Sequence, residues 1–268
     1  MRHVTLPTGV TLAVRERGPQ DGLPVVFVHG VMLSGRVFEG QLERFGARHR
    51  AIAPDLRGHG DSEKTPAGHT VASYAADLRA LFELLDVDRP VLVGWSMGAM
   101  IAWEYLQAYG QGHVRGLVIV DQPPSDFAWD GYAWGMFSPH VLDEAVQEIQ
   151  TDLAGVAGIW AGLMLHDEAS PHAPLLVQDI LKVPPSIGTS ILVNQTLRDY
   201  RPFMAEIRVP TLVAFGGDDK ATPPEAGRWI ASQIPGARLE IFEASSHVPF
   251  LEEAEAFDAA LQAFLDTL

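Results

Sequence analysis

Short continuous apolar runs recur along the chain, and segments with helical patterning lie between them. Three of these runs cover residues 25–28, 91–93 and 117–120. Such runs are typical of parallel strands that are buried on both faces of a sheet. Between the first two runs, residues 71–85 repeat apolar side chains at helical spacing, as a crossover helix between parallel strands should. The pattern predicts an α/β fold with a doubly wound, mostly parallel sheet.

The two ends of the chain extend this arrangement. Residues 1–18 alternate like a β-hairpin that turns at Thr8 and Gly9. Further strands are predicted at residues 211–215 and 239–242, and apolar residues between positions 257 and 268 mark a closing helix.

Residues 122–208 interrupt the alternation of strands and helices. This segment contains three of the six tryptophans, and a helical stripe of apolar residues runs from Val141 to Trp160. We interpret it as a helical cap inserted into one domain, whose α/β core consists of residues 1–121 and 209–268.

Composition narrows the functional classes. The chain has 268 residues, no cysteine, and 19 basic against 34 acidic residues, a net charge of −15. This charge disfavours nucleic acid and anionic lipid as partners, and the lack of cysteine excludes disulfides and thiolate nucleophiles. Without an apolar run long enough for a membrane span or an export signal near the N-terminus, we expect a cytoplasmic protein. The sequence does not indicate the oligomeric state.

A serine lies where a buried strand meets a helix. Ser96 is the centre of Gly94-Trp95-Ser96-Met97-Gly98, which follows the run at 91–93 and precedes an apolar helix. A strand, a tight turn and a helix in this order project the serine Oγ outward, and glycines on either side let neighbouring backbone pass closely. Ser96 is therefore the candidate nucleophile.

A serine hydroxyl needs a base to accept its proton and a group to orient that base. His247 lies in the loop between the last predicted strand and the closing helix, and is the candidate base. Asp218 and Asp219 follow the predicted strand at 211–215, so either carboxylate is in position to fix the imidazole. Asp121, at the end of another strand, is a third candidate for this role.

The order serine, aspartate, histidine resembles the α/β-hydrolase superfamily, in particular its branch of esterases and cofactor-free haloperoxidase-like or perhydrolase-like enzymes. The resemblance extends from Val25 to Phe264, except in the cap. The family's G-x-x-D-x-x-x-P acid turn matches Gly216, Asp219 and Pro223, which implies Asp219 as the acid. Its H-x-P-x-x-E ending matches His247, Pro249 and Glu252.

Two further motifs carry the resemblance. His29 and Gly30 match the family's H-G loop, which implies the backbone N–H groups of Val31 and Met97 as the oxyanion hole. Here Val31 and Met32 follow Gly30, where the family often has an aromatic residue and proline. The D-x-R-G-x-G-x-S motif spans residues 55–62, and we expect a structural loop there, with neither His59 nor His29 in the chemistry.

Substrate-binding and metal sites are less marked in the sequence. We expect Trp95 and the cap tryptophans to contact substrate, with Tyr132 and Phe137 as further candidates for the pocket wall; the cap tryptophans are Trp129, Trp134 and Trp160. His166, Asp167, Glu168 and His172 match no metal-ligand spacing, so neither a metal nor a cofactor is expected.

The resemblance implies hydrolysis of a small carboxylic ester or lactone through an acyl-enzyme on Ser96. Serine at position 96 argues against a haloalkane dehalogenase or an epoxide hydrolase, because the enzymes of these classes that share the fold have aspartate at the nucleophile position. Perhydrolase or haloperoxidase-like, lyase and oxygenase activities on the same residues, or a non-catalytic ligand receptor, are the alternatives. The natural substrate depends on the cap, where the resemblance does not extend.

Overall fold

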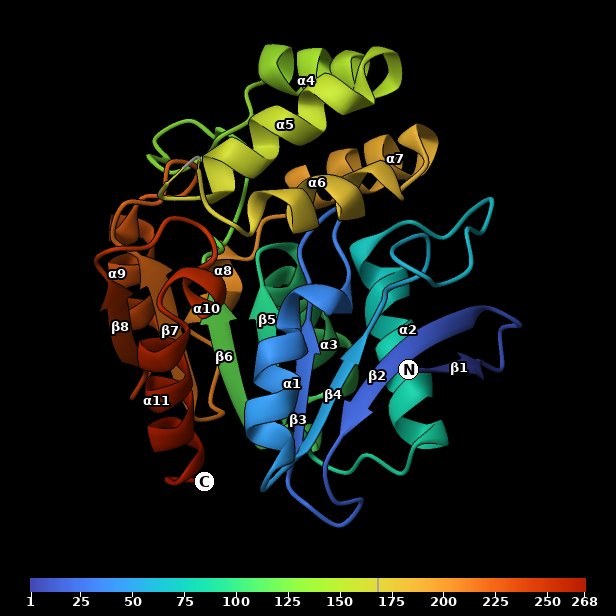
Figure 1. The fold of residues 1–268 in the computed structure, drawn as a ribbon. Coiled ribbons are helices and arrows are strands. Elements are labelled where there is room, and N and C mark those ends of the chain that lie inside the picture. Colours follow the sequence, from blue (N-terminus) through green and yellow to red (C-terminus); the bar gives the residue numbers. More distant parts are fainter. Residues whose placement is uncertain (168) are drawn as a thin grey trace.

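An eight-stranded sheet forms the centre of the protein (Figure 1). The structure is a computed structural model that describes residues 1–167 and 169–268. The strands lie in the order β1-β2-β4-β3-β5-β6-β7-β8. The pairs β1–β2 and β2–β4 are antiparallel. All other neighbouring strands, from β4 to β8 in this order, are parallel. The predicted doubly wound, mostly parallel α/β sheet is therefore confirmed. The strands are β1 (Arg2–Thr5), β2 (Thr11–Arg17), β3 (Pro24–Val28), β4 (Arg50–Pro54), β5 (Val91–Trp95), β6 (Gly116–Val120), β7 (Thr211–Gly216) and β8 (Arg238–Phe242).

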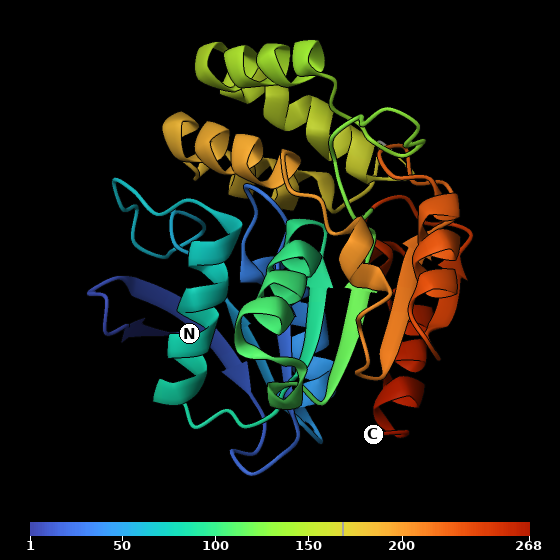
Figure 2. The same cartoon turned by 180° about the vertical axis from the view of Figure 1, so that it is seen from behind.

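Helices cover both faces of the sheet. α1 (Glu39–Gly46) and α11 (Ala254–Leu265) lie on the face seen in Figure 1, and α2 (Val71–Leu84), α3 (Met97–Tyr109) and α9 (Pro224–Gln233) cover the other face in Figure 2. The central strands β4, β5, β6 and β7 are buried along their whole length, which explains the continuous apolar runs in β5, β6 and β7. Three short helices belong to the core, η1 (Gly35–Phe38), η2 (Gln111–His113) and α10 (Pro249–Glu252), and α8 (Arg201–Met204) lies near the end of the segment 122–208.

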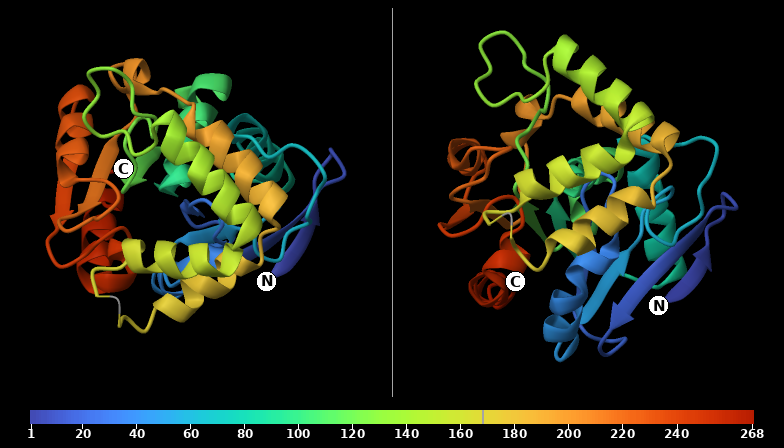
Figure 3. Two further views of the ribbon diagram at one scale, coloured as in Figure 1. Left: turned by 90° about the horizontal axis from the view of Figure 1, so that it is seen from above. Right: turned by 45° about the horizontal axis from the view of Figure 1, so that its top comes forward.

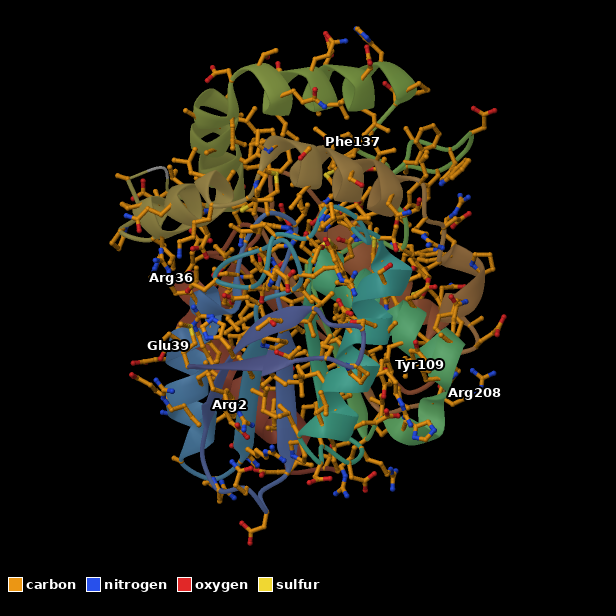
Figure 4. The ribbon with its side chains drawn as sticks, turned by 90° about the vertical axis from the view of Figure 1, so that its right-hand side faces the viewer. Arg2, Arg36, Glu39, Tyr109, Phe137 and Arg208 are labelled. Carbon is orange, nitrogen blue, oxygen red and sulfur yellow. The ribbon has the colours of Figure 1, made fainter. Side chains whose placement is uncertain are left out.

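Four helices of the segment 122–208 lie across the carboxyl ends of the strands, as the view from above shows (Figure 3). They are α4 (Pro139–Thr151), α5 (Leu153–Met164), α6 (Ala173–Leu181) and α7 (Pro185–Thr196). Arg36, labelled in Figure 4, joins the core to α6, since its guanidinium donates to Gln178 and lies 3.5 Å from the Asp179 carboxylate.

Two details differ from the sequence patterns. The stripe from Val141 to Trp160 is not one helix, because the chain breaks at Asp152, whose side chain caps α5 by accepting from the Gly155 N–H. Strand β4 was not foreseen; two of its five residues are alanines, and its apolar run is short. No helix among the described residues is both long and apolar enough to cross a bilayer.

Candidate active site

Ser96 occupies the turn between β5 and α3. Its backbone has φ 52° and ψ −128°, in the left-handed half of φ space that non-glycine residues rarely adopt, and the next residue begins α3. A Cβ at Gly98 would overlap the carbonyl oxygen of Val28, so only glycine lets the turn pack this closely against β3. Strain of this kind persists where surrounding packing imposes it, and here it presents the Ser96 side chain at the end of the sheet.

His247 and Asp219 form a hydrogen-bonded pair next to this turn. The imidazole Nδ1 lies 2.7 Å from Oδ2 of Asp219, and both side chains are buried. The backbone of His247 is fixed as well, because its carbonyl accepts from the indole N–H of Trp95 at 2.7 Å. Ser96 forms no hydrogen bond with His247 among the described contacts, although both line one cavity; such bonds often tighten only in a substrate complex.

The Asp219 carboxylate is surrounded by donors. Its Oδ1 accepts from the backbone N–H groups of Ala221 and Thr222, and its Oδ2 accepts from the Thr222 hydroxyl and His247. Burial alone would raise the pKa of Asp219, but the positive charge of the imidazole and these hydrogen bonds lower it below its ordinary value. The group is therefore an anion that holds a proton on Nδ1 of His247.

The two rival carboxylates have different surroundings. The carboxylate of Asp218 is exposed and lies 2.8 Å from the His166 ring. Asp121 is fully buried; its Oδ1 accepts from the Gly216 N–H, and its Oδ2 has no hydrogen-bond partner among the described residues. Burial, and then repulsion from Asp219, raise the pKa of Asp121 well above its ordinary range. Of the three, only Asp219 is hydrogen-bonded to the imidazole.

The cavity that Ser96 and His247 share has a volume of about 120 Å³. Drug-sized ligands occupy pockets of roughly 300–1,000 Å³, so this one is suited to a small substrate. The cap supplies most of its apolar wall, through Phe137, Trp160, Leu163, Met164 and Leu192. Figure 4 labels Phe137 at the level of the cap helices.

Only Trp160 of the four expected tryptophans is part of this wall. Trp95 is fully buried and supports the backbone of His247 instead. The indole of Trp129 is held by Ser125 and lies against Arg201, whereas Trp134 packs on Trp229 with 5.6 Å between ring centroids. These three side chains are held by contacts with other residues of the protein, so they do not reach the cavity.

The backbone N–H groups of Val31 and Met97 lie beside the serine. Met97 is the first residue of α3, so its N–H has no partner within the helix, and Val31 lines the cavity. Neither N–H donates to a protein acceptor among the described residues. A Cβ at Gly30 would lie 3.5 Å from Ser96 Oγ, which shows how closely the preceding loop approaches the serine.

Buried histidines brace this loop. One ring nitrogen of His29 lies 2.8 Å from the Gly30 carbonyl oxygen, and the other accepts from the Leu56 N–H. Burial lowers the pKa of His29 to about 3, so the ring is neutral. His59 packs against His29, and Asp55 accepts from Arg15 and from the backbone of Gly35 and Asp61. The motif at residues 55–62 thus ties the loop to the sheet.

Asp121, Asp219 and His247 also form the one group of described residues with the spacing of metal ligands, their ligand atoms lying within 4.8 Å of one another. The hydrogen bond between Asp219 and His247 already satisfies this pair. His166, Asp167 and His172 are not part of such a group, and Glu168 lies outside the described residues.

The sequence patterns did not reveal two contacts between the cap and this site. The end of α5 is tied to the loops that carry the acid and the base, because Leu163, Met164 and Leu165 accept from Ser246 Oγ, His247 N and Lys220 Nζ. The second contact is a polar corner of the cavity, formed by Gln122, Asp126 and Gln195. The sequence does not predict it, because amides and acids at these spacings form no recognisable motif.

Comparisons with known proteins identify the family and the fold. A model of the alpha/beta hydrolase fold family matches residues 24–254. The pimeloyl-[acyl-carrier protein] methyl ester esterase of Neisseria meningitidis is 31% identical over 94% of this chain and 97% of the relative. An esterase from Exiguobacterium antarcticum superposes with a TM-score of 0.92 at 26% identity, covering 98% of both chains. A bromoperoxidase from Bacillus anthracis shares the fold, with a TM-score of 0.92 at 23% identity, over 99% of this chain and 100% of that one.

Proposed function

Because this chain belongs to the alpha/beta hydrolase fold family, we propose that it hydrolyses a small carboxylic ester or lactone through an acyl-enzyme on Ser96. The observation that carries the proposal is the strained turn that presents Ser96 in the same cavity as a histidine oriented by a buried carboxylate. The ester hydrolases among its relatives support the reaction class.

The proposed mechanism assigns one role to each group. Oγ of Ser96 attacks the substrate carbonyl carbon while its proton passes to Nε2 of His247, and Asp219 keeps the other proton on Nδ1 and stabilises the imidazolium. The N–H groups of Val31 and Met97 stabilise the negative oxygen that develops. The imidazolium then protonates the leaving alcohol. Water, losing a proton to the same histidine, attacks the acyl-enzyme and releases the acid with Ser96 restored.

Trapping the nucleophile tests this proposal. A fluorophosphonate should label Ser96 in a 1:1 ratio, located by peptide mass spectrometry, and the labelled protein and Ser96→Ala should both lose hydrolysis of p-nitrophenyl acetate. Undiminished hydrolysis by Ser96→Ala, or labelling elsewhere, contradicts the mechanism. Stoichiometric labelling without turnover of any ester in a graded panel would identify a receptor, and bleaching of monochlorodimedone with peroxide and bromide in place of ester hydrolysis would identify haloperoxidase chemistry.

The cavity volume sets an expectation for the acyl group. A volume of about 120 Å³ is well below the roughly 300–1,000 Å³ of pockets that hold drug-sized ligands. We therefore expect p-nitrophenyl acetate and butyrate to be hydrolysed with higher kcat/KM than the octanoate. Trp160→Ala, which removes part of the wall, should narrow this difference. A preference of the unmodified protein for octanoate, measured below its micellar concentration, contradicts a compact acyl site.

A further inference from the structure

The wall of the cavity has one polar corner away from the serine and the histidine. Gln122 and Asp126 follow β6, and Gln195 comes from α7; all three line the cavity and are at most 3% exposed. The two amide groups donate to the same carboxylate, Gln122 to Oδ1 of Asp126 at 2.7 Å and Gln195 to Oδ2 at 3.0 Å. The corner therefore joins the end of a core strand to a helix of the cap.

The carboxylate fixes the orientation of both amides. A carboxylate accepts hydrogen bonds and cannot donate them, so the NH₂ group of each glutamine has to face Asp126. The carbonyl oxygen of Gln195 then points elsewhere, and it is buried without a hydrogen-bond partner among the described residues. A buried acceptor without a partner is costly, which favours an occupant of the cavity that donates to it.

The charge of the corner indicates which donor. Burial raises the pKa of Asp126 to about 6, against the hydrogen bonds from both glutamines and the positive charge of His247. Near neutral pH the group is mostly an anion, which repels an anionic substrate. Each of its oxygens already accepts from an amide, which leaves only their remaining lone pairs for a donor on the substrate. The buried acceptor without a partner in this corner is the neutral amide oxygen of Gln195, which suits a hydroxyl group.

We propose that Gln195, oriented by Asp126, determines substrate specificity by accepting a hydrogen bond from a hydroxyl group of the substrate, so that the preferred substrates are small uncharged hydroxy esters. The proposal rests on the proposed function and narrows its substrate class. Asp126 acts through Gln195 as a positioning residue.

Matched pairs of esters test it. In each pair one hydroxyl replaces one methyl: methyl lactate against methyl isobutyrate, methyl 3-hydroxybutyrate against methyl 3-methylbutyrate, and 2-hydroxyethyl acetate against propyl acetate. Each enzymatic kcat/KM ratio is divided by the ratio of the hydroxide-catalysed rates, which removes the intrinsic reactivity of the esters. We expect the hydroxy ester to be preferred about tenfold in at least one pair, which corresponds to about 1.4 kcal/mol for one recovered hydrogen bond.

Variants separate specificity from folding. Gln195→Met keeps the length of the side chain but removes the amide acceptor, and should abolish the preference within the pair. Gln147→Met, the same change on the exposed surface of α4, should retain it. Asp126→Asn releases the orientation of Gln195 and should reduce the preference. Because the readout is a ratio within a pair, a general loss of active protein does not change it.

A binding measurement distinguishes failure of this proposal from failure of the proposed function. Calorimetry with Ser96→Ala should show tighter binding of the hydroxy ester of the preferred pair whether or not Ser96 is the nucleophile. Equal affinities or equal corrected rates within every pair, a preference that survives Gln195→Met, or stronger selection of the ammonium analogue 2-aminoethyl acetate would overturn the assignment. Activity that persists in Ser96→Ala contradicts the proposed function alone.

Discussion

Replacing Asp219 by asparagine should disable the base while leaving the fold intact. The substitution is nearly isosteric, but it replaces one of the two accepting carboxylate oxygens, which are surrounded by donors, with a donating NH₂ group. If the amide oxygen keeps the backbone N–H groups of Ala221 and Thr222, the new NH₂ group faces Nδ1 of His247. The ring then has to accept at Nδ1 and carry its proton on Nε2, where it cannot take the serine proton.

The size of the effect follows from this change of tautomer. In serine proteases, which share the arrangement on another fold, the equivalent change lowers kcat by about 10⁴. In the proposed mechanism Asp219 also stabilises the imidazolium, and the lowered pKa of its carboxyl group shows that the site favours its anion. We expect a decrease of about 10² to 10⁴ in kcat, equivalent to about 3–5 kcal/mol in the activation barrier. KM should change much less, because Asp219 is not part of the cavity wall.

Two sibling variants provide the controls. Asp218→Asn alters an exposed side chain that pairs with His166, and kcat should change by less than about twofold. The raised pKa of Asp121 favours its neutral form, and the amide of Asp121→Asn is also neutral and still accepts from the Gly216 N–H. The decrease in kcat should therefore stay within about tenfold. The assay is kcat for p-nitrophenyl butyrate, normalised by active-site titration, with thermal melts to verify folding. Near-normal Asp219→Asn beside a disabled Asp121→Asn would transfer the orienting role to Asp121.

Three further expectations concern the turn, the corner and acid stability. Gly98→Ala should abolish hydrolysis and lower the melting temperature, because its Cβ would overlap the Val28 carbonyl; unchanged activity would contradict the close packing of the turn. The preference for hydroxy esters should weaken below about pH 6, where Asp126 gains a proton and one glutamine has to turn its oxygen towards it. A constant ratio of the two kcat/KM values from pH 5 to 8 would refute this expectation. Burial lowers the pKa of His29 in the folded protein to about 3, below the ordinary histidine value of about 6.5. Protons therefore bind the unfolded chain preferentially as the pH falls through about 6.5, and stability is lost. Between pH 7 and 5 the contribution of His29 amounts to about 2 kcal/mol, so urea titrations should show a loss of stability that is smaller by about this amount in His29→Gln than in the unmodified protein. Buried His59 contributes a loss of the same sign in both proteins.

Much of the core could be predicted because its signals are local. A strand buried on both faces has to be apolar at consecutive positions, so β3, β5, β6 and β7 were visible in the sequence. The turn at Ser96 was visible because only glycine fits on either side of it. The sequence does not predict strand β4, because its short run of alanine and isoleucine hardly differs in hydropathy from its surroundings. It also does not predict the helix break at Asp152, because aspartate occurs both at helix caps and within helices.

The cavity wall could not be predicted in the same way, for a geometric reason. Parallel strands end at one edge of a sheet, so residues that follow β5, β7 and β8 are brought together by the order of the strands alone. Helices of the cap have no such register, and their positions depend on which side chains pack where. Asp126 and Gln195 are 69 residues apart, and nothing in either local sequence relates them before α7 is placed. The positions of the proposed reacting groups can therefore be predicted from short motifs, whereas the proposed selection of the substrate depends on contacts that exist only once the cap has packed on the sheet.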